Sequence, residues 1–332
     1  MITSKSAVQT KIGAFKYFDP SLLSGGGRLF ALILICVIMS MLSPVFFSAR
    51  NLSNIITNAC IMTILGVGLT ITIITCGPDL SVGSILTITS VIAAIMLKAG
   101  IFFGWAILAA LALGILLGLL NGLMISKIGI PSFISTYGLQ WAVFGFAYVI
   151  LKGYVVYDFD PAFRFVGNGY LFDVIPMPII VMLGVVIVGF IILKKTTLGR
   201  TFYAVGANKE AAKMSGINVE KTMIYAFIIC GLLSAVGGIV LVARINACQA
   251  DIGKNYLLPT IATVYMGGTR AAGGQGGVIG TLIGALIMTV VENGMNLMGV
   301  PSVWRGAIIG ALIIITVLVN QWLNKKLEAA GA

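Results

Sequence analysis

The sequence contains no histidine, and only 10 of its residues are Asp or Glu. Without histidine the chain cannot build a Ser-His-Asp or Cys-His catalytic arrangement. No Walker A motif is present either, so we expect no ATP hydrolysis by this chain. We therefore expect no catalytic residues, no metal site and no cofactor in it. The five cysteines follow no CxxC spacing, which favours apolar packing residues over a metal centre: Cys36, Cys60, Cys76, Cys230 and Cys248.

Charge is also scarce. Charged residues make up only 9% of the chain, whereas soluble domains carry about 25%. Hydrophobic residues make up 59%, and the mean hydropathy is +1.08. Apolar runs long enough to span a bilayer fill the sequence from Arg28 to Leu323. The composition predicts an all-α polytopic membrane protein, with an unusually hydrophobic soluble enzyme as the alternative.

Charges and Gly/Pro breaks divide the apolar sequence into about ten transmembrane segments. The third and eighth are short, so each is either a full span or a half-helix or re-entrant segment. The division predicts an N-terminal tail over 1–28, a single transmembrane domain over 29–323 and a C-terminal tail over 324–332. The expected segments are residues 29–47, 54–76, 82–98, 102–126, 132–151, 174–193, 220–243, 257–268, 277–298 and 302–323.

Basic residues predict the orientation, because they concentrate in cytoplasmic loops. With ten crossings, 14 of the 21 Lys and Arg residues fall on the side of the N-terminus, mostly in the tail and in the loop 194–221. Both termini are then cytoplasmic. The net charge of +11 is explained by topology and anionic headgroups, so no nucleic-acid partner is expected.

Acidic residues are rare near the apolar segments, where Asp79 and Glu292 stand almost alone. Ion-coupled carriers and intramembrane enzymes usually place several ionisable groups at membrane depth. Their scarcity favours an energy source on another polypeptide. A secondary carrier remains the alternative, because backbone carbonyls also bind sodium.

The loop 194–221 contains a short helix by its capping pattern. Asn208 is a plausible N-cap and Gly216 a plausible stop for a helix from Lys209 to Ser215. Such a helix could dock into a groove of a partner. Equally, the loop could be a basic topological segment that touches only water and headgroups.

A family resemblance decides between these alternatives. The loop carries the pattern Gly-x-Asn-x-x-Ala-Ala-x-x-Ser-Gly-Ile, which resembles the cytoplasmic coupling loop of ribose/galactose-type permeases of bacterial ABC importers. Similar stretches follow in the family's order along nearly the whole chain. They are Asp79-Leu-Ser-Val-Gly-Ser84, Pro131-Ser-Phe-Ile134, Gly267-Gly-Thr269, Gly273-Gly-x-Gly276, Asn293-Gly294 and Gly299-Val-Pro301.

The sequence departs from the family pattern in two places. Gly77-Pro78-Asp79 replaces a Gly-Gly-Ile-Asp stretch, and Pro259 is expected to break the eighth segment. These departures leave the identity of the solute open.

The resemblance implies a permease subunit in the bacterial inner membrane, where it translocates a small polar solute, typically a monosaccharide. It also implies a homodimer, a cytoplasmic ATPase subunit that carries ATP and Mg, and a periplasmic or lipid-anchored solute-binding protein. The residues expected to couple the chain to the ATPase are Gly206, Asn208, Lys209, Glu210, Ala211, Ala212, Ser215 and Gly216.

Small and polar residues inside the segments suggest two further roles. Glycines at four-residue spacing predict close helix packing, within the chain or at a dimer axis. Polar residues at helical spacing are candidates for the solute path, and hydrogen bonds between neighbouring helices would explain them equally well. The packing glycines are Gly114, Gly118, Gly122, Gly280, Gly284, Gly306 and Gly310. The candidate path residues are Ser132, Thr136, Gln140, Asn293 and Asn296.

The two halves of the chain contain similar short motifs, which suggest a weak internal repeat. Asn121-Gly122 followed by Gly129-Ile-Pro-Ser132 resembles Asn293-Gly294 followed by Gly299-Val-Pro-Ser302. Five segments separate the two, as an inverted repeat requires. The spacings differ by two residues, so chance is a fair competitor. The repeat predicts halves near 29–151 and 174–323.

Overall fold

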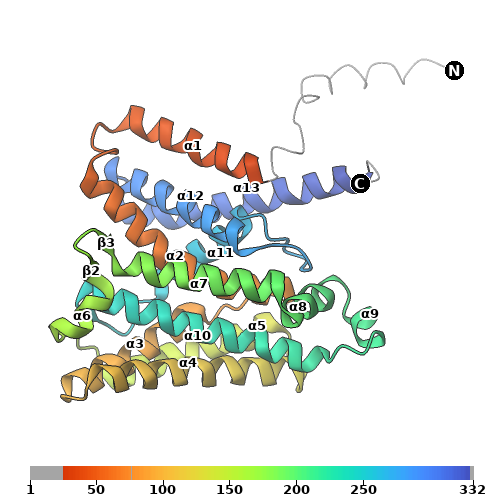
Figure 1. Ribbon diagram of the computed structural model, residues 1–332, viewed down its shortest axis with the longest axis horizontal. Helices are drawn as coiled ribbons and strands as arrows, with labels where there is room; N and C mark the ends of the chain where they lie inside the picture. The colour runs from red at the N-terminus through yellow and green to blue at the C-terminus, as the bar shows by residue number, and fades with distance from the viewer. Residues whose placement is uncertain (1–24, 76, 330–332) are drawn as a thin grey trace.

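The computed structural model describes residues 25–75 and 77–329, which form an almost entirely helical bundle (Figure 1). Cys76 and most of the expected N-terminal tail lie outside the described residues. Ten of the described helices overlap the ten expected segments, one helix to each segment. They are α1 (Gly25–Leu42), α2 (Ala49–Thr75), α3 (Val82–Lys98), α4 (Phe103–Ser126), α5 (Ser132–Leu151), α7 (Met177–Lys195), α10 (Val219–Ile245), α11 (Leu257–Met266), α12 (Val278–Leu297) and α13 (Ser302–Ala329).

Six of these helices are long and apolar enough to cross a membrane by length and composition: α2, α4, α5, α7, α10 and α12. The polytopic prediction is therefore confirmed at this level. The apolar parts of α1, α3 and α13 are shorter. The 10 residues of α11 rise only about 15 Å, half of a bilayer core, so α11 cannot cross by itself.

The remaining elements cap the two ends of the bundle. The sequence predicted only one of them, α9 (Lys209–Met214), from its capping residues. At one end lie α6 (Pro161–Asn168) and two short antiparallel strand pairs. The first joins two distant segments, β1 (Val156–Tyr157) and β4 (Ala247–Cys248), and the second is a hairpin of β2 (Tyr170–Leu171) and β3 (Ile175–Pro176). We call this the α6 end. At the opposite end, the α9 end, α8 (Thr197–Ala207) precedes α9 (Figure 1).

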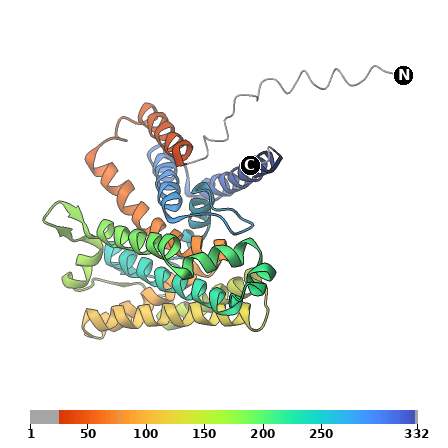
Figure 2. The ribbon, with the colours of Figure 1, turned by 45° about the vertical axis from the view of Figure 1, so that its right-hand side comes forward.

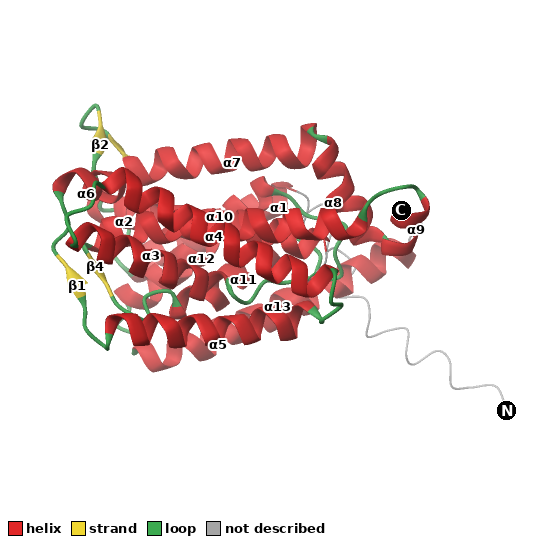
Figure 3. Ribbon diagram, turned by 90° about the horizontal axis from the view of Figure 1, so that it is seen from below, coloured by secondary structure: helices red, strands yellow, loops and turns green. Residues whose placement is uncertain are grey.

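Two central helices hold the bundle together. α2 packs against α10 and α7 on one side and against α12 and α11 on the other, and most of its residues are buried. α10 packs against α4, α2 and α3. Figure 3 shows α7 and α5 along opposite edges. In Figure 2, α1, α12 and α13 rise together from one side of the remaining helices.

Glycines allow the closest helix contacts. A Cβ added at Gly114 would lie 2.6 Å from the carbonyl oxygen of Gly231, and one at Gly122 would lie 2.9 Å from Cα of Ile224, both on α10. Gly118 lies against Phe227 of the same helix. The first glycine seam thus lies between α4 and α10 of one chain, where small residues let the backbones approach.

The other two glycine seams differ from each other. Gly280 and Gly284 of α12 lie against the backbone of α11 and of the turn after it. Gly306 and Gly310 of α13 have open space where a side chain would begin. The α13 seam therefore has no partner within the described part of the chain.

Pro259 does not break the eighth segment as we expected. It lies in the first turn of α11, directly after the 3-10 helix η3 (Lys254–Tyr256). A proline is tolerated there because the first N–H groups of a helix have no intrahelical acceptor. The Thr260 hydroxyl donates to the Tyr256 carbonyl at 2.6 Å and adds a contact across this start.

Candidate functional site

A cavity of about 530 Å³ opens toward the α6 end of the bundle. Its walls come from α2, α12, α13 and the stretch 252–259, and none comes from α5. Several polar and charged side chains line it between apolar ones. They are Asn58, Lys254, Asn255, Tyr256, Glu292, Asn296 and Arg305.

Helix geometry brings these polar groups together. Glu292 and Asn296 are four residues apart on α12 and therefore share one face. Asn58 on α2 is oriented by Arg244, whose guanidinium donates to the Asn58 side-chain oxygen at 2.7 Å. The arrangement offers amide groups that both donate and accept hydrogen bonds, with one acid and basic groups nearby.

Of the two α12 asparagines expected on the solute path, only Asn296 lines this cavity. The Asn293 amide is paired with Asn51 of α2. Each side chain donates to the other, at 3.0 and 2.7 Å. Asn51 also donates to the carbonyl of Phe46 at 2.8 Å. The Asn293 side chain thus ties α12 to α2.

The three polar residues expected on α5 lie away from the cavity. Thr136 is buried and donates to the carbonyl of Ser132 at 2.8 Å. The Ser132 hydroxyl lies against Gly77, in the stretch after α2. The side-chain oxygen of Gln140 is buried without a hydrogen-bond partner among the described residues. Ser132 and Thr136 thus contact the turn after α2 and their own helix.

At the α9 end, the expected short helix is present. The Asn208 side chain accepts from the backbone N–H of Ala211 at 3.0 Å and caps α9. After the helix, Gly216 adopts a φ of +79°, and the N–H of Ile217 donates to the carbonyl of Ala212 at 3.0 Å. The prediction of a helix that starts after Asn208 and stops before Gly216 is confirmed.

One face of α9 is anchored and the other is open. Ala212 is only 4% exposed and packs with Ile125, Val205, Met223 and Phe227. The remaining residues of the expected coupling set lie on the surface, with Gly206 half-buried. The exposed ones are Asn208, Lys209, Glu210, Ala211, Ser215 and Gly216. Ala212 thus anchors α9 against α4, α8 and α10, and the opposite face of the helix is exposed.

The preceding helix α8 connects this region to the bundle. Gly206 lies against the carbonyl of Ile74, the penultimate residue of α2. A Cβ added at Gly206 would lie 2.7 Å from the backbone nitrogen of Gly274. The N–H of Gly274 donates to the same Ile74 carbonyl at 2.9 Å. The end of α2, α8 and the glycine-rich loop 267–277 therefore form one contact.

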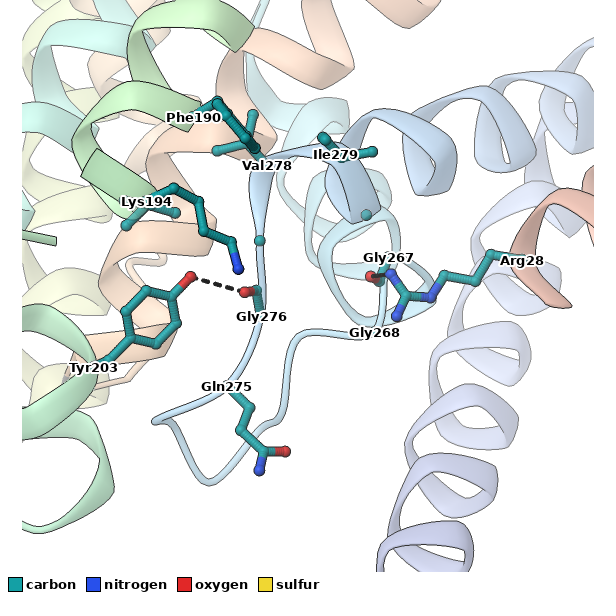
Figure 4. A pocket seen from close by; sticks show the side chains of 13 residues that line it. Arg28, Phe190, Lys194, Tyr203, Gly267, Gly268, Gln275, Gly276, Val278 and Ile279 are labelled. Carbon is teal, nitrogen blue, oxygen red and sulfur yellow. Dashed lines mark hydrogen bonds between the residues drawn. The ribbon is translucent and has the colours of Figure 1, made fainter. Parts of the chain in front are cut away.

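The loop 267–277 is held from both sides (Figure 4). The Tyr203 hydroxyl of α8 donates to the Gly276 carbonyl at 2.9 Å, and Arg28 of α1 donates to the Gly267 carbonyl at 2.6 Å. Burial raises the pKa of Tyr203, so it remains a neutral donor at physiological pH. A cavity of about 350 Å³ lies between these groups and Lys194.

No group of three or more Cys, Asp or Glu side chains that could hold a metal ion occurs in the part of the chain that the structure describes. The main features of the described structure are the polar cavity at the α6 end and the exposed, anchored helix α9 at the opposite end.

Most of this chain is similar in sequence to known proteins. Residues 51–317 match the profile of a family described as the permease component of branched-chain amino acid transport systems. The chain is 38% identical to the ribose import permease protein RbsC of Escherichia coli over 315 residues, which cover 94% of this chain and 97% of that protein.

Two relatives from Haemophilus influenzae are named for other sugars. The xylose transport system permease protein XylH is 31% identical, with 89% of this chain and 96% of the relative covered. The galactose/methyl galactoside import permease protein MglC is 32% identical, with 94% and 98% covered. No solved structure matches the chain.

Proposed function

The chain belongs to the permease family of ABC importers, and on that premise we propose that it imports a sugar through the cavity at the α6 end. It is a non-catalytic, multi-pass subunit of the inner membrane that works with a separate ATPase subunit and a solute-binding protein. One observation carries the mechanism: α9 is exposed on one face, while the adjoining α8 contacts the end of α2 and the loop before α12.

The solute is most consistent with a pentose or hexose. The relatives are named for ribose, xylose and galactose. The amides of Asn58, Asn255 and Asn296 in the cavity can both donate to and accept from sugar hydroxyls. A branched-chain amino acid is the second candidate, because the family profile is described for that substrate.

Competition in a transport assay separates the two candidates. The chain is reconstituted in liposomes with its ATPase subunit and binding protein, and uptake of labelled ribose is measured. Unlabelled xylose or galactose should compete more strongly than leucine. Uptake of leucine without any uptake of sugars would contradict the proposal.

We assign energy coupling to α9, with ATP and Mg bound by the partner subunit. The proposed mechanism is alternating access. When the ATPase closes, it moves α9 and α8, which shift the end of α2 and the loop 267–277. These contacts lead to α12, which carries Glu292 and Asn296 to the cavity. The cavity then opens in turn to a docked binding protein and to the cytoplasm.

We place the α9 end in the cytoplasm, together with both termini. Lys194, Lys195, Arg200, Lys209 and Lys213 all lie in or beside α8 and α9, in agreement with the rule that positive loops stay inside. Labelling of single cysteines introduced at Lys209 and at Tyr154 by an impermeant maleimide tests this assignment. Only the Tyr154 position should react from outside.

We further propose ten membrane segments in one permease domain, 29–323, arranged as two inverted halves. Each proposed half contains a 27-residue helix, α2 or α10, followed by an irregular stretch and a shorter helix, α3 or α11. Gly129 follows α4 and Gly299 follows α12, at opposite ends of the bundle. Both glycines have a positive φ. An experimental structure whose halves cannot be superposed would contradict the repeat.

A second copy of this chain is the proposed neighbour of α13. The helix exposes Val303 and Trp304, and it leaves open space at Gly306 and Gly310. Val303 and Gly306 also border the cavity, so a partner on this face would complete its wall. A Gly310→Cys variant should form a disulfide-linked dimer in membranes, whereas Gly138→Cys on α5 serves as an exposed control.

A further inference from the structure

Asp79 is a buried acid that the proposed mechanism does not use. It lies in the stretch that interrupts the chain between α2 and α3, and none of its surface is exposed. An ionised carboxylate removed from water costs several kcal/mol unless a cation or several hydrogen-bond donors compensate for it. The groups around Asp79 therefore determine which protonation state the fold can hold.

The two carboxyl oxygens have different surroundings. Oδ1 accepts from the backbone N–H of Ser81 at 2.8 Å and from the Ser81 hydroxyl at 2.6 Å. Oδ2 is buried and has no nitrogen or oxygen partner among the described residues. The titratable group that faces the carboxyl is the Cys230 thiol of α10. No described residue forms an ion pair with Asp79.

Ser81 links the carboxyl to three helices, through its hydroxyl and its backbone carbonyl. The hydroxyl accepts from the side-chain nitrogen of Asn121 on α4 at 2.8 Å. The Asn121 oxygen in turn accepts from the Ser135 hydroxyl of α5 at 3.3 Å. Ser84 of α3 donates to the Ser81 carbonyl at 2.9 Å. With Cys230 on α10, the network joins the interrupted stretch to α3, α4, α5 and α10.

The direction of these hydrogen bonds fixes where a proton is needed. Because Ser81 donates its only hydroxyl proton to Oδ1 and accepts from Asn121, Oδ1 must be an acceptor. Oδ2 is the atom left without a nitrogen or oxygen donor among the described residues, and apart from Ser81 the only described polar neighbour that can help the carboxyl is the weakly donating Cys230 thiol. A bound cation would require several free oxygen ligands around it. Here Ser81 and Asn121 use their polar atoms on each other, and a thiol faces the carboxyl.

We propose that Asp79 carries a proton on Oδ2 and works as a neutral positioning residue that fixes the break between α2 and α3. The acid of the Asp79-Leu-Ser motif is thus a hydrogen-bonding group that is free of charge. Its role is to hold the interrupted stretch against the bundle, next to the end of α2 that α8 contacts.

The first test compares three variants by thermal unfolding in detergent and by ATP-driven uptake in liposomes. Asp79→Asn imitates the neutral acid and should keep uptake within about twofold. Asp79→Ala leaves the Ser81 hydroxyl without its acceptor and should reduce uptake by about tenfold. This factor corresponds to the free energy of one buried hydrogen bond. The exposed Asp158→Asn is the control for loss of an acid, and it should match the wild type.

The second test is independent of transport and of the solute. Infrared spectra of the wild-type protein labelled with ¹³C-aspartate should contain the carbonyl band of a protonated carboxylic acid at neutral and mildly alkaline pH. Asp79→Asn should lose that band. Spectra with only ionised carboxylate, or an Asp79→Asn variant as impaired as Asp79→Ala, would overturn the proposal. Failed sugar uptake with the band intact would count against the proposed function alone.

Discussion

The cap of α9 offers the sharpest test of energy coupling. α9 has only six residues, far below the roughly 12 to 15 that an isolated helix needs in water, so its ends decide whether it forms. Asn208→Ala removes the acceptor for the Ala211 N–H, which costs about 1 kcal/mol. That loss reduces the ratio of formed to frayed helix about fivefold. We expect solute-stimulated ATPase activity and uptake to fall by a similar factor, while basal ATPase activity remains.

The chain supplies a matched control for this change. Asn218 caps α10 in the same way, through the N–H of Lys221 at 2.9 Å. Asn218→Ala therefore removes an equivalent bond, but α10 has 27 residues packed against α4 and α2. Asn218→Ala should therefore leave solute-stimulated ATPase activity and uptake near the wild-type values. Asn208→Ser keeps a capping oxygen and should show nearly wild-type coupling, unlike Asn208→Ala. Equal effects of Asn208→Ala and Asn218→Ala would refute the assignment of coupling to α9.

Three further outcomes are expected. Gly118→Val should destabilise the protein by roughly 1–3 kcal/mol because the valine side chain would collide with the α10 backbone. Gly138→Val on α5 is the control, because open space surrounds Gly138, and melting curves in detergent compare the two variants. Asn293→Ala should cost about 1–3 kcal/mol by unpairing buried Asn51, and reduced solute affinity at unchanged stability would contradict this reading. Burial raises the pKa of Cys248 to about 12 from 9.0, so its maleimide labelling, followed by mass spectrometry, should stay negligible until the protein unfolds. Because the unfolded thiol ionises first, this residue should also lower stability as pH rises above about 9, and ready labelling of the folded protein at neutral pH would be inconsistent with the burial.

Hydropathy and capping were sufficient to predict the long helices and α9. Apolar runs of the right length have few alternatives in a bilayer, and Asn208 and Gly216 act on their own immediate neighbours. Pro259 was interpreted wrongly because a proline interrupts the interior of a helix but is tolerated in its first turn. The helix α8 was missed because it is neither long enough nor apolar enough to produce a membrane signal.

Long-range partners were the part that sequence could not supply. Asn293 has the polarity and spacing of a path residue, but its amide pairs with Asn51, 242 positions away. The glycine seams on α4 and α13 look alike in sequence, yet among the described residues only the α4 seam packs against another helix of the chain. The network around Asp79 likewise depends on Asn121 and Ser135, which only the folded bundle brings together.

The most direct measurement is solute uptake into liposomes that contain this chain with and without its ATPase subunit. The binding protein and labelled sugar are supplied outside, ATP is enclosed, and an ionophore collapses any ion gradient. The account predicts uptake that requires both the ATPase subunit and ATP and that survives the ionophore. Uptake by this chain alone that disappears with the ion gradient would contradict it and identify a secondary carrier.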